Sequence, residues 1–260
     1  LAGTLPCPYR PDGTPVADGK LRQSSLLFDP AGDCLARYDK IHLFKATVND
    51  STGNYDEGRT FEAGNALIVA DTEFGKVGMM VCFDIRFPTL AVKLRELGAD
   101  ILTAPSAFTY QTGKAHWHAL LTARALDSQC MVIGAGQTGD HVVNPSAPSN
   151  VRSTWGHSEF ISSDGENVLT QTIDAANDAV TRDFDITNNL DDLPLSAKAA
   201  SWLPKSDGRP ELDQTADKTT FYQQAPSVIF ADFDADAQQI TRQNIALLEC
   251  QKLTIIANNT

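Results

Sequence analysis

Gly75-Lys-Val-Gly-Met-Met-Val-Cys-Phe-Asp-Ile-Arg-Phe-Pro88 is the stretch around which the remaining segments can be arranged. Its apolar run Val77–Val81 predicts a buried strand that delivers Cys82 to its C-terminal edge. Pro88 suits the first turn of a helix but not its interior, so we expect a helix over about 89–97. A thiol on such a strand-to-helix turn is held rigidly, and a following helix N-terminus favours its anion. The stretch indicates a thiolate nucleophile at Cys82, with a small buried core cysteine as the alternative.

The segments after this helix predict a parallel sheet. A short apolar strand over 99–105 is reached through Gly98, a helix C-cap. Strand, helix and strand in that order imply a parallel crossover, which places Cys82 and Ser106 at neighbouring C-terminal strand ends. We expect the loop 106–113 to form a pocket wall, followed by a helix over 114–128 and a strand over 131–134.

The N-terminal region reads as an antiparallel meander over residues 1–40, followed by a polar loop over 45–64 with Glu57 in its middle. Loops of this length in a compact domain are often functional. Lys40 stands where the strand pattern ends, among the apolar residues Ile41, Leu43 and Phe44. It is either a solvated surface lysine or a desolvated ammonium that stabilises an oxyanion. His42 is either a base partner for a cysteine or a hydrogen-bonded structural residue.

Composition excludes several classes of protein. The net charge is 21 − 33 = −12, which argues against nucleic acid or an anionic membrane as a partner. No run approaches the ~18 apolar residues of a membrane span. The five cysteines are widely spaced without a CxxC pair, so neither a disulfide framework nor a zinc site is indicated. A reducing, cytoplasmic setting is the default expectation.

The C-terminal third leaves two alternatives open. Trp155–Ser162 and 168–172 bracket a turn and predict a hairpin. Either 179–185 or 228–234 then forms the last strand of the sheet, and we favour the second. The region around 188–225 lacks periodicity and reads as an insertion within a single domain over 1–260, closed by a tail helix over 235–250.

Six motifs in order resemble the nitrilase superfamily of carbon–nitrogen hydrolases, specifically its Nit branch. They are Tyr38-Asp-Lys-Ile-His-Leu-Phe44, the Tyr55-Asp-Glu-Gly…Ala-Gly64 loop, Val81-Cys-Phe-Asp-Ile-Arg-Phe-Pro88, Pro105-Ser-Ala-Phe-Thr-Tyr-Gln-Thr-Gly-Lys-Ala-His-Trp117, Ala123-Arg-Ala-Leu-Asp-Ser-Gln-Cys130 and Trp155-Gly-His-Ser158. The wording of the fourth motif is most similar to amidases that act on deaminated glutathione. The ω-amidases that act on α-ketoglutaramate are slightly less similar.

The resemblance implies an α/β fold, an α-β-β-α sandwich that assembles into a homodimer or higher homo-oligomer. It implies Cys82 as nucleophile, Lys40 as oxyanion-stabilising cation, Glu57 as assisting glutamate and the backbone N–H of Phe83 as a second oxyanion donor. A thioester forms on Cys82 as a small-molecule amide is cleaved, and neither a metal nor an organic cofactor is needed.

Further residues are candidates for binding the substrate. Arg86 offers a bidentate fork for a carboxylate, with an ion pair to Asp84 or Glu96 as the structural alternative. Ser106, Phe108 and Thr112 are expected to line the pocket. The residues His116, Trp117 and His118 are expected to serve helix packing and the surface.

One element of the family pattern is missing. The general base of the family is a glutamate in an early strand, whereas no glutamate precedes Glu57 here. The strand–helix–strand–helix unit that normally precedes the Gly3-Thr-Leu-Pro segment has no counterpart either. Three interpretations stay open: a longer natural chain, which we favour, an inactive truncated remnant, or a catalytically silent nitrilase-fold interaction module. We favour the longer natural chain because the absence of a quarter of the fold would expose a large apolar face.

Overall fold

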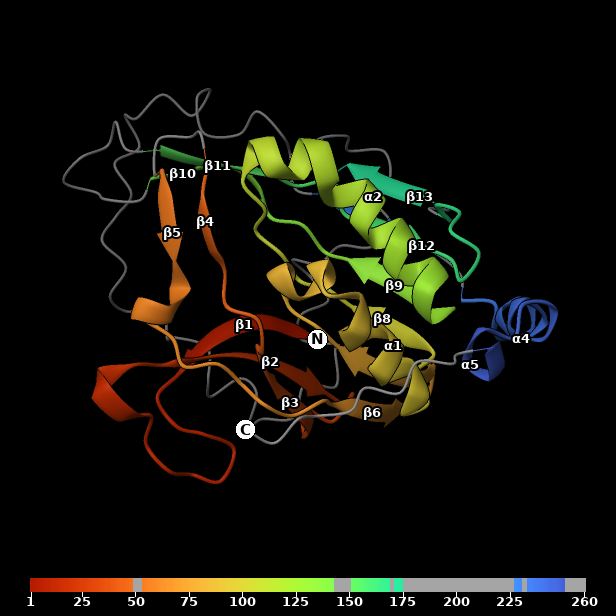
Figure 1. The fold of residues 1–260 in the computed structure, drawn as a ribbon, viewed down its shortest axis with the longest axis horizontal. Coiled ribbons are helices and arrows are strands. Elements are labelled where there is room, and N and C mark those ends of the chain that lie inside the picture. The colour runs from red at the N-terminus through yellow and green to blue at the C-terminus, as the bar shows by residue number, and fades with distance from the viewer. Residues whose placement is uncertain (49–52, 143–150, 169–170, 175–226, 231–232, 251–260) are drawn as a thin grey trace.

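The computed structural model describes residues 1–48, 53–142, 151–168, 171–174, 227–230 and 233–250 (Figure 1). Its central sheet has five strands in the order β12-β9-β8-β7-β6. The strands are β6 (Val69–Thr72), β7 (Gly75–Met79), β8 (Ile101–Thr103), β9 (Met131–Gly134) and β12 (Glu159–Ile161). The middle three are parallel, and the two edge strands run antiparallel to their neighbours.

Two helices make the crossovers between the parallel strands, as predicted. Helix α1 (Pro88–Glu96) joins β7 to β8, and α2 (Tyr110–Ser128) joins β8 to β9. Helix α2 begins four residues earlier than the expected 114, within the segment predicted to be a loop. Gly113 suggested the end of a loop, but it lies inside the helix. Its glycine is required by packing, since a Cβ there would overlap the side chain of Trp155.

A second, three-stranded antiparallel sheet confirms the predicted meander. It consists of β1 (Ala2–Cys7), β2 (Arg22–Phe28) and β3 (Cys34–Asp39), with the short 3-10 helix η1 (Ala17–Gly19) between the first two. Buried residues from both sheets form one apolar cluster, which includes Leu27 and Tyr38 from the meander and Val77 and Met79 from the central sheet. The two sheets therefore pack face to face.

Helices α1 and α2 cover the other face of the central sheet. Their buried residues Leu94, Trp117 and Leu121 form a second cluster with Leu102 and Val132 of the sheet. The described part of the chain therefore has three layers, α-β-β, of the expected α-β-β-α sandwich (Figure 1). The fourth, helical layer is not among the described residues.

Two predicted loops contain short strands. Strands β4 (Lys45–Thr47) and β5 (Asn54–Asp56) pair within the expected 45–64 loop and lead into the 3-10 helix η2 (Glu57–Arg59). Strands β10 (Thr138–Val142) and β11 (Val151–Trp155) pair within the expected 136–153 loop. All five residues of β10 are exposed, so the strand lacks the apolar alternation by which a sequence reveals one.

The C-terminal region differs from its prediction in two ways. Strand β13 (Gln171–Asp174) pairs with β14 (Ser227–Phe230) in a separate two-stranded sheet, rather than β14 joining the central sheet. The tail forms two helices, α4 (Ala235–Asn244) and α5 (Leu247–Cys250), and at the break between them the amide of Gln129 donates to the carbonyl oxygen of Ile245 at 2.6 Å. The segments 179–185 and 188–225 lie outside the described residues.

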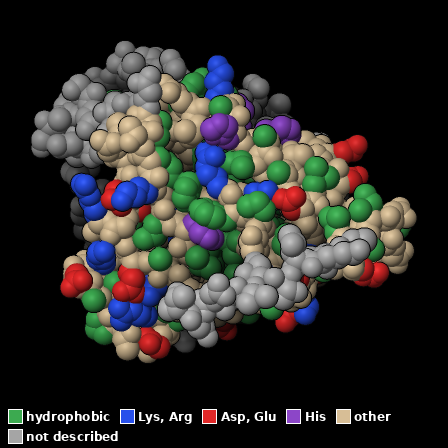
Figure 2. Space-filling model, viewed as in Figure 1, with side chains coloured by type: hydrophobic (Ala, Val, Ile, Leu, Met, Phe, Trp, Pro, Cys, Tyr) green, Lys and Arg blue, Asp and Glu red, His purple; other side chains and the backbone are tan. Residues whose placement is uncertain are grey.

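The surface carries both signs of charge. Acidic and basic side chains are interspersed on the face shown in Figure 2, without a broad basic region on that face. Within the described ranges, no helix is long and apolar enough to cross a membrane. The same ranges hold no group of three or more His, Cys, Asp or Glu side chains placed to share a metal ion.

Candidate active site

Cys82 stands on a strained turn shortly after β7, which ends at Met79. It is the first residue of the 3-10 helix η3 (Cys82–Arg86), and its φ of 52° lies in the left-handed region that non-glycine residues seldom adopt. Its N–H donates to the carbonyl oxygen of Pro105 at 3.0 Å, which ties the turn to the end of β8. Strain of this kind costs on the order of 1–3 kcal/mol and is concentrated at functional sites.

This geometry changes one expectation about the turn. Helix η3 separates Cys82 from α1, so the helix that begins at Pro88 does not start directly after the thiol. The 3-10 turn instead leaves the N–H of Phe83 ahead of the first intrahelical bond, which runs from Asp84 to Val81 at 3.0 Å. Among the described residues no acceptor is bound to the Phe83 N–H, so a backbone donor stands next to Cys82.

Cys82 and Cys130 illustrate the two possible fates of a thiol. Cys82 is partly exposed, whereas Cys130 is completely buried in the helix-covered core. Burial raises the pKa of the Cys130 thiol, which favours its neutral, inert form. The core-cysteine alternative therefore describes Cys130, and Cys82 has the accessibility that a nucleophile needs.

The buried carboxylate of Asp84 connects the Cys82 turn to the segment that carries Lys40. It accepts hydrogen bonds from the Tyr38 hydroxyl at 2.8 Å and the Val81 N–H at 2.9 Å. It also accepts from the backbone N–H of His42 at 3.0 Å, and the Nδ1 atom of His42 lies 2.7 Å away. Burial, followed by the charge of Asp84, raises the pKa of Tyr38. His42 also stacks on Phe87 at 3.6 Å, so it is the hydrogen-bonded structural residue rather than a base for Cys82.

Lys40 is desolvated and paired with Glu57. Its side chain is 1% exposed, and its Nζ lies 2.6 Å from Glu57 Oε2. The Phe44 N–H donates to the same oxygen at 2.7 Å, and the Gln23 amide donates to the other oxygen at 3.4 Å. The Lys40 backbone is clamped between the carbonyl of Gln23 and the N–H of Gly64, at 2.9 and 2.8 Å. The ammonium is therefore fixed in direction, as expected of the apolar-flanked alternative.

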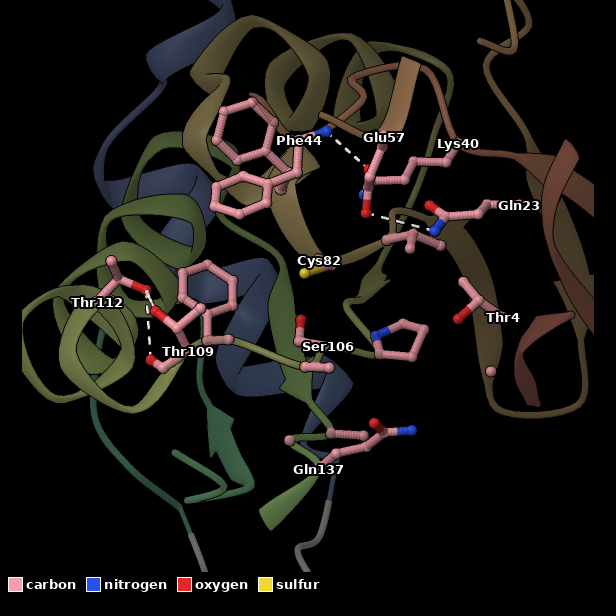
Figure 3. Close-up of a pocket in the computed structure, with 18 of the residues that line it drawn as sticks. Thr4, Gln23, Lys40, Phe44, Glu57, Cys82, Ser106, Thr109, Thr112 and Gln137 are labelled. Carbon is pink, nitrogen blue, oxygen red and sulfur yellow. Dashed lines mark hydrogen bonds and ion pairs between the residues drawn. The ribbon is translucent and has the colours of Figure 1, made fainter. Parts of the chain in front are cut away.

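These groups open into one cavity of about 490 Å³. Figure 3 shows the sulfur of Cys82 pointing into it, with Lys40 and Glu57 on one side and Ser106 on the other. All eight residues predicted from the sequence line this cavity: Lys40, Glu57, Cys82, Phe83, Arg86, Ser106, Phe108 and Thr112. The fold therefore brings the predicted residues together, while their chemical roles stay predictions.

The hydroxyl groups in the wall bind their own backbone. Ser106 is buried and donates to the carbonyl oxygen of Ala104 at 3.0 Å. The Thr112 hydroxyl lies 2.7 Å from that of Thr109, near the start of α2 (Figure 3). These side chains use their hydroxyl donors within the wall, while their oxygen lone pairs can still accept a hydrogen bond from a ligand.

Arg86 is oriented by aromatic rings rather than by an acid. Its guanidinium lies 5.3 Å from the centroid of the Phe108 ring, and its Nη2 donates to Nδ1 of His116 at 3.2 Å. Neither carboxylate of the expected ion pair contacts it, since Asp84 faces the opposite network and Glu96 pairs with Lys93 at 2.6 Å. Burial lowers the pKa of Arg86, and the negative charge of the neighbouring Cys82 sulfur opposes that effect.

The expected packing roles on α2 are largely confirmed. Trp117 is 1% exposed and donates to the carbonyl oxygen of His157, and His118 is exposed and lies 2.6 Å from Glu159. His116, however, contacts Arg86, which lines the cavity, although His116 itself does not line it.

Sequence reasoning missed several polar residues of the cavity, among them Gln23, Gln137 and Arg152. Gln23 comes from the meander and the other two border the β10–β11 hairpin. An arginine three residues before the Trp155-Gly-His-Ser158 motif was the only signal available for Arg152. The fold brings Arg152 to the cavity wall, because its strand β11 pairs with β10 beside the cavity.

Comparison with known proteins agrees with this geometry. Residues 2–186 match the family described as carbon-nitrogen hydrolase. The deaminated glutathione amidase of Yersinia enterocolitica is 46% identical over 152 residues, which are 58% of this chain and 50% of that protein. The probable hydrolase nit2 of Schizosaccharomyces pombe is 41% identical over 169 residues, 64% of this chain and 59% of that protein.

Among solved structures, the NitFhit protein of Caenorhabditis elegans is 36% identical with a TM-score of 0.52, and the match covers 62% of this chain and 36% of that one. The chain spans about half the length of the curated relatives it matches. The family match ends at residue 186, before 228–234, and the choice between the two candidate strands stays a prediction because 179–185 lies outside the described residues. The resemblance read from the six motifs is confirmed, and the chain belongs to the carbon–nitrogen hydrolase family, the nitrilase superfamily.

Proposed function

We propose that this chain carries the thiol centre of an amidase, with Cys82 as the nucleophile. The observation that carries the proposal is the strained, accessible Cys82 on a cavity shared with a fully desolvated lysine. A cysteine nucleophile and a fixed cation beside it are the parts that acyl transfer through a thioester requires.

The reaction proceeds in two halves. The Cys82 thiolate attacks the amide carbon, and the electron pair of the carbonyl moves onto oxygen to give a tetrahedral oxyanion. Lys40 and the Phe83 N–H stabilise that oxyanion. Its collapse breaks the C–N bond, the leaving nitrogen takes a proton, and ammonia or an amine departs. Water then attacks the thioester, which releases the carboxylic acid and restores the thiol.

Glu57 has the role of orienting Lys40 in this scheme. Its carboxylate already receives Lys40, the Phe44 N–H and the Gln23 amide. A carboxylate held by three donors is a rigid counter-charge and has little freedom to carry a proton to the leaving group. The proton transfer belongs to the early-strand glutamate of the family pattern, for which the sequence has no counterpart before Glu57.

The substrate class is a small amide that carries a carboxylate. Arg86 supports this choice, because its guanidinium borders the cavity without a carboxylate partner among the described residues. The Yersinia relative is named deaminated glutathione amidase, and we take deaminated glutathione as the first compound to test, with α-ketoglutaramate second. A homodimeric assembly remains a prediction from the family resemblance, and a cytoplasmic location remains one from the cysteine pattern.

The test is hydrolysis of these two amides by the full chain, followed as α-ketoglutarate or ammonia released. Cys82→Ala is expected to lower the rate by at least 10³-fold. Cys34→Ala, which changes an exposed thiol outside the cavity, is the matched control and is expected to keep full activity. Unchanged turnover in the Cys82 variant would refute the proposal. A folded chain that cleaves neither amide would instead favour the silent interaction module.

A further inference from the structure

The charge of the cavity is opposite to that of the whole chain. Four charged side chains line the cavity: Lys40, Glu57, Arg86 and Arg152. The first two neutralise each other at 2.6 Å, which leaves two guanidinium groups. The chain as a whole carries −12. A concentration of positive charge in this cavity of such an acidic chain points to an anionic ligand.

Arg152 is held in place without being neutralised. Its Nη2 donates to the carbonyl oxygen of Ala107 at 2.6 Å, and its guanidinium lies 5.6 Å from the centroid of the Tyr55 ring. Its Nε is buried and has no hydrogen-bond partner within the described part of the chain. No carboxylate of the described residues lies within ion-pair distance of it. An arginine has five N–H donors, so most of its capacity remains open.

The two guanidinium groups stand against consecutive residues of one wall. Arg86 packs on the ring of Phe108, and Arg152 binds the carbonyl of Ala107. The hairpin that carries Arg152 is joined to the same wall by the Trp155 N–H, which donates to the carbonyl oxygen of Phe108 at 3.1 Å. The two charges therefore have a fixed relation to each other, although they come from η3 and β11.

Two like charges that line one partly desolvated cavity are unfavourable unless anions compensate them. One carboxylate can satisfy one guanidinium fork through a bidentate pair. We propose that Arg152 forms a second carboxylate subsite beside Arg86, so that the cavity selects amides with two carboxylates over amides with one. This inference deepens the proposed amidase function and rests on it only for the identity of the bond cleaved.

The experiment measures binding, so that it does not depend on turnover. The full chain with Cys82→Ala is titrated calorimetrically with succinate, glutarate and adipate, and with the monoamide of each. Each monoamide has the shape of its diacid and one charge less. With Arg152 present, we expect the best-fitting diacid to bind at least 10-fold more tightly than its monoamide.

Arg152→Gln keeps a donor for the Ala107 carbonyl but removes the charge, and is expected to reduce that preference to less than 2-fold. Arg152→Lys keeps the charge and is expected to retain most of it. Arg59→Met removes a cation whose side chain is 85% exposed, outside the cavity, and is expected to change nothing.

The outcomes separate this inference from the proposed function. A preference that is equal in Arg152→Gln and in the parent, or no binding of any diacid to the parent, overturns the second subsite. A preference that disappears in Arg152→Gln but persists in Arg152→Lys supports it. That result stands even if the chain with Cys82 intact cleaves no amide, in which case only the proposed function fails.

Discussion

Replacing Asp84 by asparagine is expected to destabilise the protein by about 3 kcal/mol, although the two side chains have the same shape. Each carboxylate oxygen of Asp84 faces one backbone N–H that cannot turn away: Oδ2 faces Val81 and Oδ1 faces His42. Asparagine keeps one oxygen, so its NH₂ group must point at one of these two donors. A buried donor left without a partner costs about 1–3 kcal/mol.

A second contribution comes from the bonds that remain. Hydrogen bonds to a charged group contribute about 1.5–3 kcal/mol each, against about 0.5–1.5 kcal/mol for neutral pairs. The Tyr38 hydroxyl, at 2.8 Å, is the clearest bond weakened in this way. Relief from burying a charge offsets part of the loss, which leaves the net value near 3 kcal/mol. For a chain of this size that corresponds to roughly 6–12 °C in Tm.

The assay is urea unfolding monitored by circular dichroism, with Asp12→Asn as the control. Asp12 is exposed and accepts from the Thr14 N–H at 2.9 Å, a turn that asparagine also supports. The control is expected to change stability by less than about 0.5 kcal/mol. If Asp84→Asn is equally well tolerated with an unchanged m-value, the network does not hold the Cys82 turn and our reasoning about it is wrong.

Three further predictions concern the surroundings of the site. Glu57→Gln removes the counter-charge of the Lys40 side chain, which is 1% exposed, so we expect the free energy of unfolding in urea to fall by about 3 kcal/mol. A decrease below about 1 kcal/mol would contradict a desolvated ion pair. Gly64→Ala is expected to destabilise the protein by about 1–3 kcal/mol, because the new Cβ would overlap a backbone carbonyl oxygen at the end of β3. Equal thermal stability of the two proteins would show that the backbone at this position moves to accommodate the Cβ. The hydrogen bond from Arg10 lowers the pKa of Glu62 from 4.5 to about 2, so the stabilisation from the ionised Glu62 is complete above pH 4.5 and is lost as pH falls towards 2. In Glu62→Gln we expect the free energy of unfolding to depend less on pH in that window, and identical pH profiles of the two proteins would argue against the shift.

The sequence by itself determined the central part of the fold and the nucleophile turn. The apolar run before Cys82, the proline at 88 and the glycine at 98 specify strand, helix and strand through local periodicity and backbone sterics. A parallel crossover follows from that order, and it places Cys82 and Ser106 at one edge of the sheet. These features depend on residues that are neighbours in the chain, so the sequence alone is sufficient to predict them.

The tertiary structure decided which interactions give those residues their environment. The positive φ of Cys82, the carboxylate of Asp84 turned towards Tyr38 and the desolvation of Lys40 arise from contacts 15 or more residues apart in sequence. Strand β10 is exposed along its length, so no apolar period predicted the hairpin that carries Arg152 to the cavity. Polar strands are specified by pairing and by the wall on which they rest, and both exist only in the folded chain.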